Sequence, residues 1–315
     1  MSKNTTPSVA MTLQIAGKGA ARAARRRREK ENKRRVHQSF GVNRRPRWLT
    51  YTILLLVVLV FAYPLYYTFL LASSDAPTIA KTPIPSLIPR GNFIANLDRV
   101  MNSGIDLWGA FINSLIVAVI VSLSVVFFST LAGFAFSKLR FRGRDGLLTF
   151  VIATMAVPAQ LGVVPLFMIM AKLGWTGQLI SVIVPGMVSA FGVFWMTQYI
   201  RDALPYELIE SARVDGASLF RTFRSIALPA ALPAASMLAL FTFVGSWTNF
   251  FWPFIVLGTE NPTLPVALQL LQASWFKDYS LIMAGVIVAT VPLVILFVFA
   301  GRQLVSGIMQ GAVKG

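Results

Sequence analysis

Long apolar runs separated by short polar segments form the main pattern of this chain. Six runs lack Asp, Glu, Lys, Arg and His and are long enough to cross a bilayer: 49–72, 110–137, 147–171, 178–200, 226–257 and 280–300. A helix of about 20 apolar residues crosses the ~30 Å hydrocarbon core. The pattern therefore predicts an all-α, polytopic membrane protein with six transmembrane helices.

Two of these runs carry additional signals. Run 226–257 is too long for one simple helix, and we expect Pro253 to end it or to begin a re-entrant turn. Run 49–72 follows a charged segment of 47 residues, and this is too long for the charged region of a cleaved signal peptide. We expect this first run to remain in the protein as an anchor.

Composition indicates a lipid environment and excludes most catalytic sites. Hydrophobic residues make up 56% of the 315 residues and charged residues only 13%, so a soluble chain of this composition would lack the polar residues to cover its surface. The sequence has no cysteine and a single histidine, His37. Disulfide frameworks, cysteine metal sites and most histidine-based catalytic arrangements are therefore excluded.

Basic residues are concentrated in alternate connecting segments. Segment 1–47 contains 14 Lys and Arg against two Glu, and segments 138–146 and 201–225 are also rich in Arg. Three other segments are poor in basic residues: 73–109, 172–177 and 258–279. Because Lys and Arg in short loops favour the cytoplasm, we expect a multi-pass protein with both termini and segment 201–225 in the cytoplasm.

The chain divides into a basic tail, 1–47, and a six-span membrane domain, 48–315. The tail has a net charge of +12, and no aromatic residue interrupts its arginines before Phe40. Nucleic-acid binding would favour interleaved aromatic side chains for base stacking. We therefore expect a disordered tail or an interfacial helix that contacts anionic lipid, with nucleic acid as the less favoured partner.

The apolar runs lack the charged residues that ion-coupled transporters use. Proton relays within membranes require Asp, Glu, Arg or His, and sodium sites built from backbone carbonyls are harder to exclude. The sequence also lacks a Gly-x4-Gly-Lys-Ser/Thr phosphate-binding loop. Uphill transport would therefore draw its energy from another polypeptide, and an ATP-independent channel remains an alternative.

Segment 201–229 is polar and lies between two long apolar runs. We expect Asp202 to cap a short helix that starts at Leu204-Pro205, with Glu207 and Glu210 near the positive end of its dipole. Gly216 is expected to break that helix or to allow close backbone approach. The alternative is an ordinary interfacial helix whose charges face water.

A second helix is expected after the glycine. Leu219, Phe223 and Ile226 have the spacing of one apolar helix face, and Pro229 and Pro233 follow at the start of the fifth run. Two short helices at the membrane surface, the second continuing into a span, would transmit motion from a soluble partner into the bilayer.

The segment resembles the cytoplasmic loop signature of the permease subunits of ABC importers. The matching positions are Glu210, Ser211, Ala212, Asp215, Gly216, Ile226, Leu228 and Pro229, and Ser211 stands where the family often has alanine. Further matches point to the carbohydrate-uptake, maltose-type branch: Asn113 to Leu115, Gly133 to Arg144, Pro158 to Gln160, Pro165 to Phe167, Val214 to Ser218 and Gly311 to Gly315. The resemblance runs from about residue 50 to the C-terminus.

This resemblance implies a transport subunit that is not an enzyme and that works in a prokaryotic inner membrane. Its implied partners are a second permease subunit, with a heterodimer expected, a pair of ATP-binding subunits and an extracytoplasmic solute-binding protein. ATP and Mg²⁺ would be held by the partner ATPase, and no cofactor is expected on this chain. The resemblance implies that Glu210 and Asp215 contact the ATPase, that Gly216 permits close approach and that Pro229 stiffens the link to the fifth span.

Polar groups within the runs are candidates to line a substrate path. Sugars are recognised by amide hydrogen bonds and aromatic faces. Five side chains fit this chemistry: Asn113, Gln160, Gln198, Trp247 and Asn249. The alternative for each is hydrogen bonding between helices or anchoring by tryptophan at the interface.

Three other functions remain compatible with the residues. The same architecture could import another solute, such as an amino acid, phosphate or a polyamine. The chain could be an ATP-independent channel, or a membrane scaffold that anchors the basic tail near nucleic acid.

Overall fold

The computed structural model describes residues 48–82, 87–272 and 278–312, with side chains up to residue 301. The chain separates into two compact units, Met1–Pro64 and Leu65–Gly315. The predicted basic tail, 1–47, lies outside the described residues, as do the last three residues of the Gly311 to Gly315 motif.

Helix α2 (Trp48–Ala72) matches the first predicted span. Within the first unit its side chains are all exposed, including Trp48 and Phe61 at 76% and 77% of their surface. An exposed helix of apolar residues in a chain of this composition is suited to a lipid environment.

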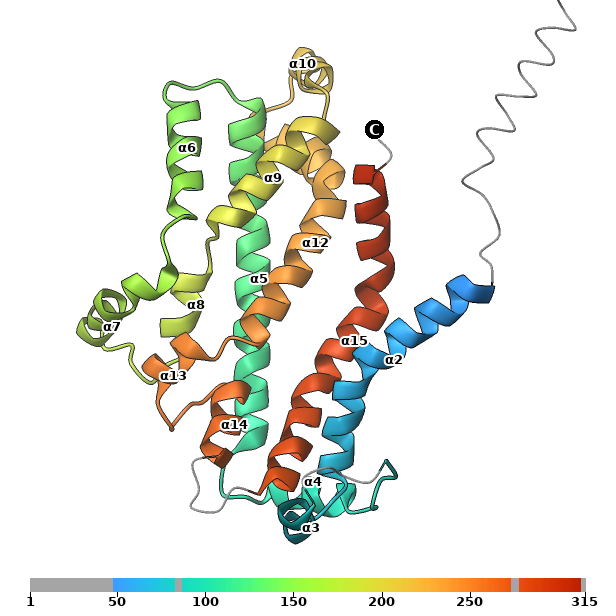
Figure 1. Cartoon of the computed structure of the whole chain (residues 1–315). Coiled ribbons are helices and arrows are strands. Elements are labelled where there is room, and N and C mark those ends of the chain that lie inside the picture. The colour runs from blue at the N-terminus through green and yellow to red at the C-terminus, as the bar shows by residue number, and fades with distance from the viewer. Residues whose placement is uncertain (1–47, 83–86, 273–277, 313–315) are drawn as a thin grey trace, which may run out of the picture. The chain divides into compact units, whose positions relative to one another are not determined.

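The regular elements that the structure describes in the second unit are all helices, joined by turns and loops (Figure 1). Its elements follow α2 in the order α3 (Ala76–Lys81), α4 (Phe93–Met101), α5 (Leu107–Lys138), α6 (Arg144–Thr154), η2 (Ala159–Gly162), α7 (Val163–Lys172), α8 (Ile180–Gly186), α9 (Ala190–Ala203), α10 (Tyr206–Val214), α11 (Leu219–Thr222), η3 (Phe223–Ala227), α12 (Leu228–Trp247), α13 (Phe251–Leu257), α14 (Leu264–Gln272) and α15 (Tyr279–Ala312). The prediction of an all-α polytopic membrane protein is confirmed.

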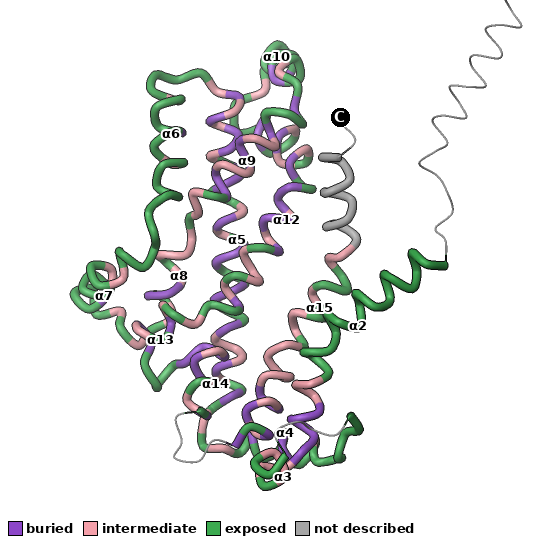
Figure 2. Tube along the Cα trace, in the orientation of Figure 1, coloured by how far each residue is buried: buried purple, intermediate pink, exposed green. Residues whose placement is uncertain are grey.

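Helices α5, α9 and α12 form the centre of this unit, and Figure 2 shows their buried positions. Glycine allows α5 and α9 to approach closely, because a Cβ on Gly133 would lie 2.8 Å from the carbonyl carbon of Met196. One turn away, a Cβ on Gly192 would meet the hydroxyl of Ser129. Small residues that let backbones approach are a common means of helix association in membranes.

The described helices supply five single spans and one bent pair. The spans are Trp48–Ala72, Leu107–Lys138, Ile180–Ala203, Leu219–Trp247 and Tyr279–Gly301. The bent pair, Arg144–Thr154 with Ala159–Lys172, turns by 89° and occupies the span predicted for 147–171. The sequence prediction did not include this bend. It lies beside Pro158, whose backbone is extended with a ψ of 123° and which disfavours helical backbone at Val157.

The break in the fifth run does not lie at Pro253, where the sequence predicted it. Helix α12 ends at Trp247, and Pro253 lies in the first turn of α13. Proline is tolerated there because the first amides of a helix have no partner within it. The chain therefore breaks at 248–250, before the proline.

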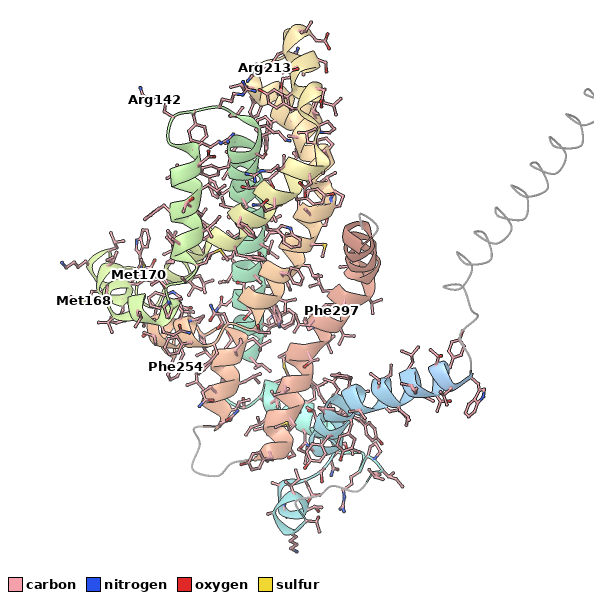
Figure 3. The ribbon with its side chains drawn as sticks, turned by 45° about the horizontal axis from the view of Figure 1, so that its top comes forward. Arg142, Met168, Met170, Arg213, Phe254 and Phe297 are labelled. Atoms are coloured by element: carbon pink, nitrogen blue, oxygen red, sulfur yellow. The ribbon has the colours of Figure 1, made fainter. Side chains whose placement is uncertain are left out.

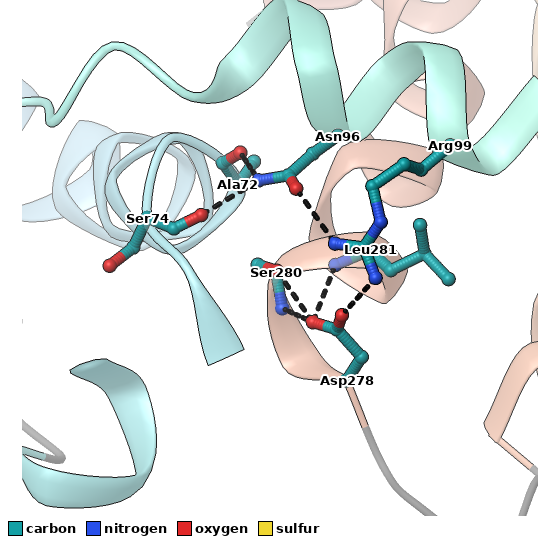
Figure 4. Close-up of polar contacts among 7 residues, drawn as sticks. All are labelled: Ala72, Ser74, Asn96, Arg99, Asp278, Ser280 and Leu281. Atoms are coloured by element: carbon teal, nitrogen blue, oxygen red, sulfur yellow. Dashed lines mark hydrogen bonds and ion pairs between the residues drawn. The ribbon is translucent and has the colours of Figure 1, made fainter. Parts of the chain in front are cut away.

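A polar network joins three segments at the end of the unit where α3, α4 and α14 lie (Figures 1 and 4). The Asn96 side chain donates to the carbonyl oxygens of Ala72, 2.9 Å away, and Ser74, 2.7 Å away. Arg99 donates to Asn96 Oδ1 and, over 2.8 Å, to Asp278 Oδ2. The end of α2, helix α4 and the start of α15 are thereby held together.

Asp278 also caps α15. Its Oδ1 accepts from the amides of Ser280 and Leu281 and from the Ser280 hydroxyl (Figure 4). Burial opposes ionisation of the Asp278 carboxyl, but the hydrogen bonds from Ser280, Arg99 and Leu281 and the charge of Arg99 hold its pKa below the ordinary value. The network is therefore fully charged at neutral pH.

The close approach of α5 and α9 predicts a large response to a small substitution. Gly133→Ala should destabilise the solubilised protein by about 1–3 kcal/mol, because the new methyl group overlaps the Met196 backbone. Gly146→Ala in α6 is the control, since no heavy atom lies within 4 Å of that Cβ position. Thermal unfolding in detergent measures both, and equal effects would contradict the proposed packing constraint.

The Asp278 network predicts an acid-dependent loss of stability. A carboxyl whose pKa is lowered by folding stabilises the protein above its unfolded pKa of about 3.9 and loses this contribution as pH falls further. Asp278→Asn should cost about 1 kcal/mol at neutral pH, since Arg99 is half exposed and partly screened. Unfolding should then depend less on pH below about 4 than in wild type. Glu260→Gln is the matched charge change, and an equal effect there would refute the assignment.

Candidate functional site

Helix α10 lies at the same end of the second unit as the loop between α5 and α6 (Figure 1). It begins after Leu204, which is 1% exposed, and Pro205. The prediction that Asp202 caps this helix is wrong, because Asp202 is part of the last turn of α9 and α10 has no side-chain cap. Pro205 fixes the backbone at the start of α10 in place of a capping carboxylate.

One side of α10 is buried and the other is exposed. Ile209 is fully buried and Ala212 is 6% exposed, whereas Glu210, Arg213 and Asp215 are exposed. The Glu210 and Asp215 carboxylates make no hydrogen bond or ion pair within the part of the chain that the structure describes. Figure 3 shows Arg213 at this end, together with Arg142. The carboxylates are therefore free to meet a partner.

Gly216 ends the helix with a specific hydrogen-bond pattern. The amide of Ala217 donates to the Ala212 carbonyl over 2.9 Å, and the amide of Gly216 donates to the Arg213 carbonyl over 3.0 Å. This is the Schellman arrangement, and it requires the positive φ of 72° that Gly216 adopts. The predicted helix-breaking role is confirmed. Apart from the neighbours of Gly216 in sequence, no heavy atom of the described residues lies within 4 Å of a Cβ placed at this position.

Contacts from α5 and the following loop hold α10 in place. The Arg140 guanidinium lies 5.3 Å from the centre of the Tyr206 ring, at the first position of α10. Lys138 Nζ donates over 3.2 Å to the carbonyl oxygen of Arg201, near the end of α9. Ile209 belongs to the same buried cluster as residues of α5 and α12. Motion of α10 is therefore coupled to the central helices.

A continuous helical segment connects this region with α12. Ser218 caps α11 by accepting from the amide of Arg221, and the π-helix η3 leads into α12 without interruption. In η3 the amide of Leu228 donates to the Phe223 carbonyl, and Pro229 follows, without an amide hydrogen to donate. Ile226 is half-buried at this junction.

The predicted apolar face of the second helix is only partly correct. Phe223 is buried and Ile226 half-buried, but Leu219 is 50% exposed. Two further apolar side chains of segment 201–229 are exposed: Phe220 in α11 at 70% and Val214 in α10 at 87%. Exposed apolar side chains beside free carboxylates are typical of a protein-binding surface.

Two of the path candidates pack between helices. Asn113 donates over 3.1 Å to the Pro262 carbonyl oxygen. Trp247 is 2% exposed and donates over 3.0 Å to the Ala289 carbonyl oxygen, with its ring stacked on Phe243. For both residues, these contacts agree with hydrogen bonding between helices, which was the alternative to lining a substrate path.

Two of the remaining three path candidates share a cavity. Gln160 and Asn249 line a space of about 350 Å³ together with Trp252 and Phe251. The Trp252 indole is held by its hydrogen bond to the Ser181 carbonyl oxygen, 3.0 Å away. An amide pair beside aromatic rings is the chemistry that sugar recognition uses.

A second cavity of about 310 Å³ shares Asn249 with the first. Its polar lining includes Ser189, Thr242 and Ser246, and Phe191 supplies an aromatic face. The sequence prediction missed these residues, although the spacing of Thr242, Ser246 and Asn249 marks one face of a helix. Gln198 lines neither of the two cavities.

The family and the relatives that this chain matches are all components of transport systems. Residues 125–306 match the family described as binding-protein-dependent transport system inner membrane component. The arabinooligosaccharides transport system permease protein of Halalkalibacterium halodurans is 30% identical over 274 residues, which cover 85% of this chain and 96% of that protein. The sn-glycerol-3-phosphate transport system permease protein of Agrobacterium fabrum is 28% identical, covering 84% and 96%.

One solved structure has the same fold. It is the crystal structure of a bacterial ABC transporter involved in the import of the acidic polysaccharide alginate, with a TM-score of 0.67 and 21% identity. The match covers 85% of this chain and 97% of the other chain.

Among the residues that the structure describes, no cluster of His, Cys, Asp and Glu could hold a metal ion.

A path candidate that packs between helices and one that lines a cavity should respond differently to truncation. Trp247→Ala should destabilise the protein by about 3–5 kcal/mol, because it removes a buried ring and a hydrogen bond. Asn249→Ala should change stability by less than about 0.5 kcal/mol, since that side chain is exposed to the cavities. Thermal unfolding in detergent measures both variants. A large loss with Asn249→Ala would show that Asn249 is a packing residue.

Proposed function

We propose, on the premise that this chain belongs to the family of binding-protein-dependent transport system inner membrane components, that it carries a sugar or oligosaccharide in an ATP-driven importer. Members of this family are multi-pass permease subunits of ABC importers, not enzymes. ATP and Mg²⁺ belong to a separate ATP-binding subunit, and a solute-binding protein delivers the substrate.

The α10 end of the second unit faces the cytoplasm in this proposal. The segments there, 138–146 and 201–225, are the most basic connections of the described chain, and basic loops are retained on the cytoplasmic side. Both termini are then cytoplasmic. The opposite end, with α4 and the Asp278 network, faces the solute-binding protein.

The coupling site consists of α10, Gly216 and the helix that continues into α12. Glu210 and Asp215 have no partner within the described chain, and Val214 beside them is almost fully exposed. Charged groups around an exposed apolar side chain suit a groove on a soluble protein. Ser211 keeps the exposed side of α10 narrow, so that it fits such a groove, and Ala212 lets the buried side pack closely against this chain.

Binding at α10 is transmitted by the continuous helix Leu219–Trp247. Ile226, Leu228 and Pro229 lie where this helix enters the membrane, and Thr242 and Ser246 on the same helix line the second cavity. When the ATP-binding subunits close, tilting of this helix changes access to the cavities. In this proposal, alternating access results from the movement of this one continuous helix.

The two cavities around Asn249 form this chain's part of the substrate path. Their polar lining consists of amides and hydroxyls, and neither cavity is lined by Lys, Arg or His. A neutral sugar suits this lining better than a phosphorylated solute, because a phosphate would need a cationic partner. The amides of Gln160 and Asn249 would donate and accept hydrogen bonds with sugar hydroxyls.

A permease pair completes the path, and a heterodimer with a second permease subunit is the assembly we propose. The relatives are transport system components of about this chain's length, since 96% of each protein is covered. Two permeases and two ATP-binding subunits then form the membrane complex.

Crosslinking tests the coupling site. The chain has no cysteine, so Val214→Cys introduces a single reactive position on the exposed side of α10. Crosslinking in native membranes should capture an ATP-binding subunit, identified by mass spectrometry. Ile94→Cys, which is also exposed, at 70%, on α4 at the opposite end, is the control and should not capture it. Failure of the Val214→Cys variant to capture an ATPase, with its thiol shown to be reactive, would favour the channel alternative.

A further inference from the structure

The loop between α5 and α6 forms a pocket separate from both cavities. It has a volume of about 410 Å³ and is lined by Arg140, Phe141, Gly143, Arg144, Asp145 and Gly146. Neither the transport path nor the coupling helix accounts for this pocket. Its lining combines two guanidinium groups with apolar surface.

Arg140 offers hydrogen-bond donors to this pocket. Its guanidinium lies over the Tyr206 ring, 5.3 Å from the ring centre, and it makes no hydrogen bond or ion pair within the described part of the chain. A cation–π contact occupies no hydrogen-bond acceptor, so the N–H groups of Arg140 keep their capacity to donate. Tyr206 therefore orients Arg140 without occupying its donors.

Arg144 is the second cation, and it is held in place by the chain. Its Nε donates over 2.9 Å to Asp145 Oδ1, and its Nη1 donates over 3.4 Å to the Leu139 carbonyl oxygen. No hydrogen bond is made by Nη2 within the described residues. With Asp145 as the one carboxylate, the pocket carries a net charge of +1, which matches a single phosphodiester.

The apolar part of the pocket continues along α6. Phe141 in the lining is 43% exposed. Gly146, also in the lining, shares a helix face with Phe150, which is 66% exposed. Figure 2 shows α6 exposed over most of its length. A ligand with a phosphate and a long apolar part would contact the arginines and this face together.

We propose that this pocket binds the headgroup of an anionic phospholipid, with its acyl chains along α6. A free phosphate would use the arginines but leave the face from Gly146 to Phe150 uncovered. Because Arg140 also lies over the ring of Tyr206, the first residue of α10, the bound lipid would help to fix the coupling helix. The proposal rests on the cytoplasmic orientation given above, but lipid binding is measurable without transport.

The experiment titrates the purified, delipidated full chain in detergent with phosphatidylglycerol or phosphatidylcholine, and native mass spectrometry counts the bound lipid. We expect the wild type to prefer phosphatidylglycerol and R140Q to lower that affinity about fivefold. R142Q is the matched control, because it changes the same charge on the same loop and Arg142 does not line the pocket. Figure 3 shows Arg142 on this loop. R142Q should keep the wild-type affinity.

Three results would overturn the proposal. An equal loss of phosphatidylglycerol affinity in R140Q and R142Q would indicate a diffuse charge effect. Equal binding of phosphatidylglycerol and phosphatidylcholine by the wild type would show that the pocket does not recognise the anionic headgroup. Displacement of the lipid by inorganic phosphate at similar concentration would identify a free-phosphate site. Capture of the ATP-binding subunit by Val214→Cys is an independent measurement, so failure here leaves the proposed function intact.

Discussion

The close packing of α5 against α9 at Gly133 and Met196 is the contact on which the rest of the second unit depends. It brings the ends of both helices together, so that Lys138 reaches the Arg201 carbonyl oxygen and α10 begins beside the loop from α5. The same packing places Val121 and Val125 of α5 at the second cavity. A wider spacing would displace the coupling helix and the path together.

Three helix breaks converge on the two cavities. Gln160 comes from the break between α6 and α7, Ser189 from the break between α8 and α9, and Asn249 from the break after α12. In a membrane, irregular backbone needs polar partners or water, and it is tolerated where it lines a cavity. The breaks therefore provide both the opening and its polar groups.

The sequence predicts the spans better than it predicts these breaks. Apolar runs determine where helices lie in lipid, and the basic loops mark which ends lie together. The positions of breaks depend on local backbone chemistry, as Pro158 shows, and on packing, since Pro253 lies in the first turn of α13 and the fifth run breaks before it. Asn113 and Trp247 illustrate the same limit, because residue type alone does not separate a packing contact from a cavity lining.

The signature around Gly216 is predictable from the sequence because its chemistry is local. A Schellman ending needs a residue that adopts positive φ, and glycine does so without strain. The length of the rigid connection beyond it depends on packing and is not predictable in the same way. The 29 residues from Leu219 to Trp247 form one helical path of roughly 43 Å. Under the proposed function, a small tilt imposed beside α10 is therefore carried to Thr242 and Ser246 as a displacement of the cavity wall.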